Sequence, residues 1–192
     1  MKLTKILIII TILIFSLQSL AKADDIRDFE IEGMSIGDSL LDFFTLEEIK
    51  RLQSVIFKDF EKRLIKIDTG SYENVVAIYK KNDPKYIIKG LTGNLGFYSG
   101  IEKCYIKMDS IQKEISSLFT NLTKKNWGIL ELDEPHQTYK PITYDFKNED
   151  RIQISCWDFR INKEKDNDRD LLKFSLYSSA FREASSSEAI KK

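Results

Sequence analysis

The chain of 192 residues is poor in the residue types that build metal sites and nucleophilic active sites. It has one histidine and two cysteines, and these lie too far apart in sequence to form a structural zinc site. Basic and acidic residues are equal in number, 30 of each, so no positive excess indicates a nucleic acid as a partner. Its glycines fit neither a phosphate-binding loop nor a dinucleotide fingerprint. We therefore expect no cofactor and no resident metal.

The N-terminus has the order of a cleavable secretory signal peptide. A positively charged start precedes the apolar stretch Ile6–Leu17, which has about 12 residues where a membrane-spanning helix needs about 20. Small residues at Ala21 and Ala23 follow, in the small-x-small pattern of a cleavage site. We expect residues 1–23 to be removed. The mature chain would then begin at Asp24, have no membrane span and be periplasmic or secreted.

The remaining sequence has the length of one domain, with residues 24–184 as its body and 185–192 as a frayed polar tail. Two capping boxes, in which a hydroxyl precedes an acid by three residues, predict short helices over 40–44 and 46–56. Apolar and β-branched runs bounded by turn-forming residues predict strands. These runs cover 64–67, 74–79, 86–91, 142–146, 151–159 and 171–177.

A longer helix is predicted over about 101–122, because apolar residues recur there at i, i+3, i+4 and i+7. Short turns join the neighbouring predicted strands, which favours antiparallel pairing. The expected fold class is therefore α+β, a mostly antiparallel sheet packed against one long amphipathic helix, with short N-terminal helices.

Three segments carry a resemblance to a known family: Ile31–Phe44, the predicted helix around Cys104, and Gln153–Asp158. With these segments the chain resembles an uncharacterised family of small exported proteins from marine Pelagibacter-like alphaproteobacteria. The resemblance covers nearly all of the mature chain and implies export and a type of organism. It implies no activity, so no functional residue is carried over.

The letters of Gly37–Leu40 match the nucleophile block of GDSL-type esterases and lipases. Asp133 and His136 supply an Asp-x-x-His pair, and His136 is the sole imidazole available as a base for Ser39. Three features oppose this interpretation. The preceding residues alternate, where a buried parallel strand is a continuous apolar run. The Gly-x-Asn-Asp block is missing, and the chain continues far beyond His136. The alternative makes Ser39 a helix cap.

A second motif has the spacing of a calcium loop. Asp166, Asp168 and Asp170 stand at positions 1, 3 and 5 of an EF-hand pattern. Position 6 of that pattern should be Gly and position 12 should be Glu, but Leu171 and Tyr177 stand there. The flanking sequence does not predict helices. We therefore favour a solvated loop between two strands over a calcium site.

The two cysteines are placed to form a disulfide. Cys104 lies on the apolar stripe of the predicted helix in line with Met108, and Cys156 is in phase with Ile154 on a predicted strand. Both side chains should therefore meet at the interface of helix and sheet, in a compartment where disulfides persist. Closing a loop of about 53 residues stabilises a fold by about 4 kcal/mol in the chain-entropy model. The alternative is two buried free thiols.

No coherent catalytic set is present, so the leading hypothesis is an exported, non-enzymatic domain that binds an envelope protein, a peptide or a small ligand. One alternative is a GDSL-type serine esterase using Ser39, Asp133 and His136. Another is an envelope-assembly or scaffold factor, which is an argument from fold analogy alone. Several aromatic residues are candidates to line a ligand groove, although core packing accounts for them equally well: Phe97, Tyr98, Trp127, Tyr139, Tyr144 and Trp157.

Overall fold

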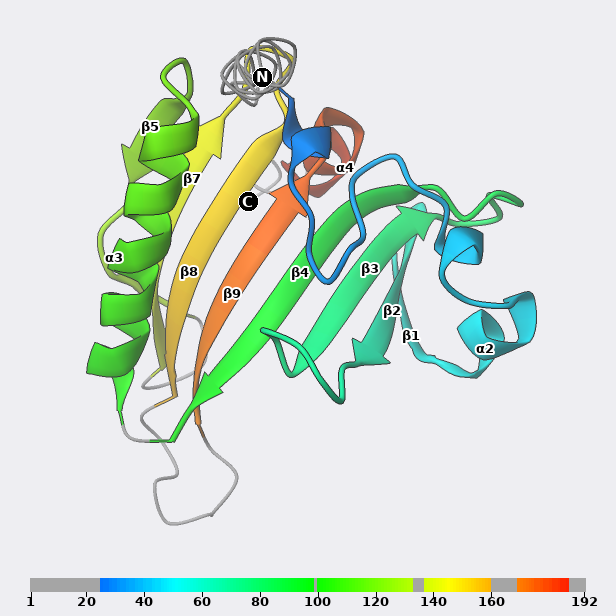
Figure 1. The fold of residues 1–192 in the computed structure, drawn as a ribbon, viewed down its shortest axis with the longest axis horizontal. Coiled ribbons are helices and arrows are strands. Elements are labelled where there is room, and N and C mark those ends of the chain that lie inside the picture. Colours follow the sequence, from blue (N-terminus) through cyan, green and yellow to red (C-terminus); the bar gives the residue numbers. More distant parts are fainter. Residues whose placement is uncertain (1–24, 99, 133–136, 160–168, 187–192) are drawn as a thin grey trace, which may run out of the picture.

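The computed structural model describes residues 25–98, 100–132, 137–159 and 169–186. These residues form one antiparallel sheet of nine strands in the order β1-β2-β3-β4-β9-β8-β7-β5, with β6 also paired to β7 (Figure 1). The strands are β1 (Gln53–Phe57), β2 (Phe60–Lys66), β3 (Asn74–Lys80), β4 (Ile88–Phe97), β5 (Thr123–Asn126), β6 (Leu130–Glu131), β7 (Gln137–Asp145), β8 (Arg151–Phe159) and β9 (Asp170–Tyr177).

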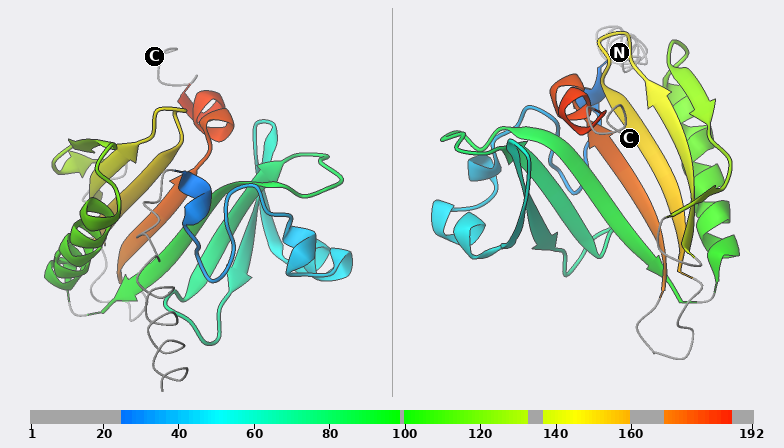
Figure 2. Two further views of the ribbon diagram at one scale, coloured as in Figure 1. Left: turned by 45° about the horizontal axis from the view of Figure 1, so that its top comes forward. Right: turned by 180° about the vertical axis from the view of Figure 1, so that it is seen from behind.

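The helices are few beside the strands. The longest, α3 (Ile101–Leu118), lies along one face of the sheet and contacts β8, β9 and β4. Helix α4 (Ser179–Ser186) follows β9, and two views in Figure 2 place it on the other side of the sheet from α3. Helix α2 (Leu46–Arg51) and the 3-10 turns η1 (Ile26–Asp28) and η2 (Leu40–Asp42) belong to the N-terminal part of the chain.

The α+β class with one dominant helix is wrong, because the described chain is mainly one antiparallel sheet. The helix predicted over 46–56 ends at Arg51, and the chain continues as strand β1. Strands β1 and β5 escaped prediction because nearly all of their residues are exposed on both faces, which leaves no alternating pattern. Helix α3 ends at Leu118, where Phe119 turns into an extended conformation.

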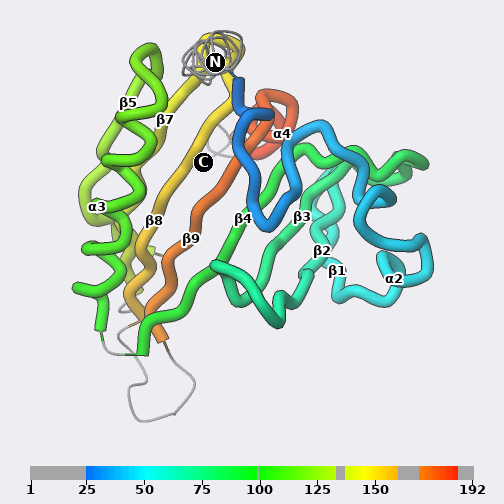
Figure 3. Tube along the Cα trace, in the orientation of Figure 1, coloured from blue at the N-terminus to red at the C-terminus, as the bar shows by residue number. Residues whose placement is uncertain are grey.

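The hydrophobic core lies on the face of the sheet that carries α3. Leu91, Ile154 and Leu172 point to this face from three adjacent strands and are fully buried. The N-terminal segment covers the same face, and Figure 3 shows it crossing β9 and β4 beside α3. It is held by Ile26 and Ile31, which have no exposed surface. Two layers, a sheet and a cover of helix and loop, therefore enclose the core.

The predicted disulfide is confirmed. Cys104 in the first turn of α3 is bonded to Cys156 in the middle of β8, with their Cα atoms 5.9 Å apart. Both side chains are buried at the interface of helix and sheet. The bond thus fixes the beginning of α3 to the centre of the sheet.

Candidate functional site

A cleft of about 550 Å³ opens between α3 and the N-terminal segment. Leu95 of β4 and Leu172 and Phe174 of β9 form its floor. Helix α3 forms one wall with Ile111 and Ile115. Most of this lining comes from regular elements and is apolar, so the cleft is a preformed space that excludes water from an apolar ligand.

The second wall consists of two loops that hold each other in place. Residues Ile31 and Met34 pair across a turn, in which Glu32 has φ 52° and Gly33 has φ 78°. This turn aims the Glu32 carboxylate at the loop between β2 and β3. The carboxylate accepts hydrogen bonds from the backbone N–H groups of Ser71 at 2.7 Å and Tyr72 at 3.0 Å. A charged acceptor for two backbone donors is a strong anchor for a loop.

The Tyr72 ring fits into the cleft because the residue below it, Gly93, has no side chain. A Cβ atom on Gly93 of β4 would lie 2.6 Å from the Tyr72 ring, closer than any real contact. The ring therefore lies directly on the backbone of β4. Glycine at position 93 and the anchor from Glu32 together fix the orientation of this aromatic wall.

The phenol of Tyr72 is a hydrogen-bond donor without a partner among the residues that the structure describes. Burial raises its pKa to about 12, and the negative charges of Glu32 and Glu114 act in the same direction. The hydroxyl is therefore protonated at all physiological pH values. It can donate to an acceptor on a bound molecule, or accept from a donor.

The rim of the cleft is acidic. Glu30, Glu32 and Glu114 line it together with one cation, Lys107. The negative charge of Glu32 is partly compensated by the two backbone N–H groups that donate hydrogen bonds to it. The remaining charges still favour a ligand whose polar end is neutral or cationic over one that is anionic.

Phe29 closes one end of the cleft. Its ring stacks on Phe119 at 4.8 Å between ring centres and lies 6.5 Å from Phe174. Phe119 also meets Phe146 edge to face at 5.5 Å. These contacts hold the last turn of α3 against the N-terminal segment and the sheet.

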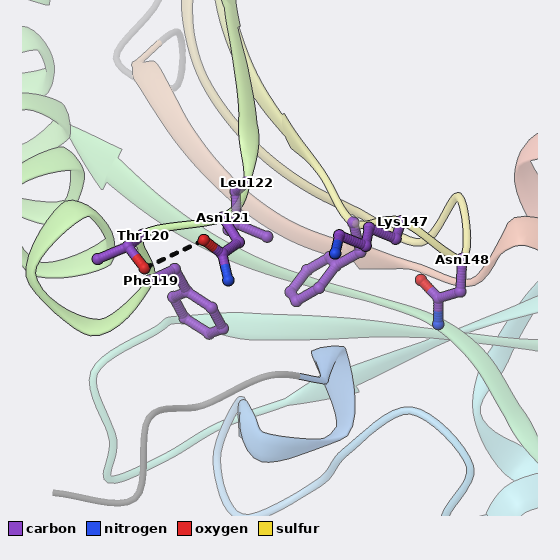
Figure 4. Close-up of a pocket in the computed structure, with 7 residues that line it drawn as sticks. Phe119, Thr120, Asn121, Leu122, Lys147 and Asn148 are labelled. Atoms are coloured by element: carbon purple, nitrogen blue, oxygen red, sulfur yellow. Dashed lines mark hydrogen bonds between the residues drawn. The ribbon is translucent and has the colours of Figure 1, made fainter.

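A second hollow of about 330 Å³ lies beyond this aromatic cluster, between the end of α3 and the turn that joins β7 and β8 (Figure 4). Three of the four polar residues at its rim bond to neighbours in their own loops, and the fourth is Lys147. Thr120 donates to Asn121 at 3.3 Å, and Asn148 donates to Asp150 at 2.9 Å. Because most of these polar groups already have partners and the hollow is smaller, the cleft of about 550 Å³ is the better candidate site.

The serine of the esterase-like block has a structural role. Ser39 is the N-cap of η2, where its hydroxyl accepts from Leu41 N–H and donates to the Lys85 carbonyl at 2.6 Å. The strand pairs of the described residues are all antiparallel, so Ser39 does not end a strand of a parallel sheet. Asp133 and His136 lie outside the described residues, and the triad stays a prediction.

The calcium motif is divided in the same way. Asp166 and Asp168 lie outside the described residues. Asp170 begins β9, is buried, and accepts a hydrogen bond from the N–H of Phe159 at 3.2 Å. Its carboxylate therefore helps to join β8 and β9. In the described ranges, no group of three or more His, Cys, Asp or Glu side chains is arranged to hold a metal ion.

The face of the sheet opposite α3 carries an unusual lysine. The Lys173 ammonium lies 3.6 Å from the centre of the Trp157 ring, which in turn stacks on Tyr139 at 4.9 Å. Burial lowers the pKa of Lys173 to about 8, and the charge of Lys62 contributes. No ion pair in the described part of the chain involves Lys173, and the Trp157 ring is the electrostatic contact that its ammonium makes there.

Sequence patterns predicted little of this site. None of the six aromatic residues considered for a groove lines the cleft. Tyr72 and Glu32 lie in loops, where no periodic pattern applies, and Gly93 lies inside strand β4. A glycine in the middle of a strand can, however, mark a close approach by another group, and Gly93 was the one available indication.

The fold and the cleft define a single-sheet β protein with a helix-walled apolar site. Comparison with protein-family models, curated proteins and solved structures finds no match. The described residues contain no helix with both the length and the apolar character needed to cross a membrane.

Proposed function

We propose that this chain is an exported, non-enzymatic binding module that holds a small amphipathic molecule in the cleft beside α3. The observation that carries the proposal is the cleft itself: a floor of Leu95, Leu172 and Phe174 below the Tyr72 hydroxyl, for which the described residues provide no hydrogen-bond partner. Its volume of about 550 Å³ falls within the range of roughly 300–1,000 Å³ that is usual for ligand sites.

The chemistry of the rim narrows the class of ligand. An apolar body would rest on the floor, while its polar end would reach Tyr72 and the carboxylates of Glu30 and Glu114. Because carboxylates outnumber the single Lys107 at this rim, the polar end is neutral or cationic. A molecule with an anionic head would meet like charge.

Export is part of the same proposal. The signal-like N-terminus and the resemblance to exported proteins support it, and the disulfide between Cys104 and Cys156 is a bond that persists in oxidising compartments. A periplasmic or secreted binding module fits these features together. The Ser39 hydroxyl is held by the Lys85 carbonyl and the Leu41 N–H, and these contacts support a capping role for Ser39 over the esterase alternative.

The proposal is tested by titrating the purified protein with Nile red, a neutral apolar dye whose fluorescence rises on leaving water. Ile111→Trp fills the cleft and should weaken dye binding at least about tenfold, which corresponds to 1.4 kcal/mol. Ile106 lies on the same helix but is 71% exposed, so Ile106→Trp is the matched control and should bind like the unmodified protein. Equal affinities of the three proteins would show that the dye does not enter the cleft.

The charge of the ligand is tested by displacing the dye with two amphiphiles of equal chain length, below their micelle concentrations. Dodecyltrimethylammonium should displace it at lower concentration than dodecanoate. Glu114→Gln removes one rim carboxylate and should reduce this preference by about two- to threefold, as expected for an exposed charge. A preference for dodecanoate would contradict the proposed class of ligand.

A further inference from the structure

The two outer strands of the sheet differ in how they are protected from pairing with other chains. Strand β5 carries Lys124 and Lys125, and charged side chains on an edge strand discourage further pairing. Strand β1 has the sequence Gln-Ser-Val-Ile-Phe, without charge or proline. Within the described sheet β1 pairs with β2 alone, so its other side is an unprotected edge.

This edge is also apolar on both faces. Val55 and Ile56 point to opposite faces of the sheet and are 57% and 60% exposed. The segment that leads into β1 adds Leu41, Phe43 and Leu46, each more than 40% exposed. Half of the large exposed apolar side chains of the described chain therefore fall between residues 41 and 56. Such concentrations mark interaction surfaces more often than isolated exposed residues do.

The backbone of β1 offers a regular set of bonding groups. Phe57 and Phe60 pair across the two-residue turn Lys58-Asp59 and exchange hydrogen bonds. Counting back from this pair, alternate residues of β1 bond to β2. The residues that alternate with these, Ser54 and Ile56, direct their N–H and C=O groups away from β2, toward the open edge.

We propose that the β1 edge pairs with the β1 edge of a second copy of this chain, antiparallel and about a two-fold axis at Val55. Ser54 of each copy then exchanges hydrogen bonds with Ile56 of the other. Val55 faces Val55 of the second copy as a non-hydrogen-bonded pair, with Cα atoms about 4.5 Å apart. The two sheets become one continuous sheet.

Charge supports a second copy as the occupant. No charged side chain of β1 faces its own duplicate in this register, so the two-fold contact has no like-charge repulsion within the strand. Beyond the strand, the same register sets Arg51 at the end of α2 and the turn residue Asp59 of the second copy at the same end of the ladder, with Lys58 opposite the uncharged Leu52. Pairing of β1 with β5 would instead set apolar residues beside lysines and produce an open chain of molecules.

Sedimentation velocity of the purified, disulfide-bonded protein over a range of micromolar concentrations tests the pairing. We expect a reversible dimer. Ile56→Lys places a charge in the interface and should raise the dissociation constant at least about tenfold. Ile129, which is 58% exposed between β5 and β6 near the opposite edge, provides the matched control, and Ile129→Lys should leave the dimer unchanged. Circular dichroism should show that both variants are folded.

Cross-linking fixes the register. Val55→Cys should form a covalent dimer on oxidation, because the expected Cα separation of about 4.5 Å lies within the range of disulfides, whereas Ile129→Cys should not. A protein that stays monomeric, a dimer that Ile56→Lys leaves intact, or equal cross-linking of both cysteine variants would overturn the proposal. A monomer that binds an extended peptide along β1 would assign the edge to a different partner.

Discussion

Replacing Lys173 by methionine measures how much a poorly hydrated cation lowers the free energy of unfolding of this protein. The ammonium lies against the Trp157 ring at 3.6 Å, and no carboxylate pairs with it in the described part of the chain. Burial, together with the charge of Lys62, lowers its pKa from 10.5 to about 8. Methionine keeps most of the apolar stem and removes the charge.

The sign and size of the effect follow from the two pKa values. Below pH 8 Lys173 is protonated in both states, and the folded state bears a cost of about 3 kcal/mol, since one pKa unit equals 1.36 kcal/mol. Between pH 8 and 10.5 the folded protein releases this proton while the unfolded chain retains it, so stability rises with pH. At pH 9.5 a cost of about 1.5 kcal/mol remains.

Urea unfolding at pH 7 and pH 9.5 provides the measurement. Lys173→Met should raise the free energy of unfolding by up to about 3 kcal/mol at pH 7, and the gain should shrink by about 2 kcal/mol at pH 9.5. Lys62, whose pKa is also lowered by burial, is present in both proteins, so its titration largely cancels. Lys113→Met on the exposed side of α3 is the control, with a change within about 0.5 kcal/mol. A gain that is equal at both pH values would refute the argument.

Three further predictions concern helix α3, the disulfide and the contact between Gly93 and Tyr72 in the cleft. Ile115→Ala should lower the free energy of unfolding by about 2–5 kcal/mol, whereas Ile106→Ala on the solvent side of the same helix should cost less than about 0.5 kcal/mol; urea titration compares them. Replacing Cys104 and Cys156 together by serine should cost about 2–5 kcal/mol, and the unreduced parent should take up no alkylating reagent when unfolded. Gly93→Ala should cost about 1–3 kcal/mol by overpacking and should also weaken Nile red binding, and intact binding would contradict the close contact at this position.

The parts of the fold that were predictable are those with one buried face. Strand β8 occupies the predicted residues 151–159, because the buried residues Ile152, Ile154 and Cys156 recur at every second position on the face that carries α3. The same phase placed Cys156 opposite Cys104. Strand β1 has no buried face. Most of its residues were therefore predicted to continue the helix before it. The predicted class was wrong because the described chain is mainly one antiparallel sheet, to which such exposed strands add and beside which helices are few.

The cleft was hidden for a different reason. Glu32 and Tyr72 are far apart in sequence and lie in loops, where no periodic pattern applies. They meet because the turn between Ile31 and Met34 crosses the sheet to the β2–β3 loop. The contact depends on the path of the N-terminal segment over the sheet, and that path is set by buried residues such as Ile26 rather than by any local motif.

The disulfide fixes one end of the cleft wall that α3 forms. Helix α3 is joined covalently to β8 at Cys104, near its beginning, whereas its last turn is retained by packing of Phe119 between Phe29 and Phe146. The first turn of the helix is thus held by a covalent bond, and its last turn by side-chain packing. A ligand too thick for the resting cleft would swing the Leu118 end outward and leave the Cys104 end in place. Reduction of the disulfide would remove the covalent attachment at Cys104, and a thick ligand could then displace either end of the helix.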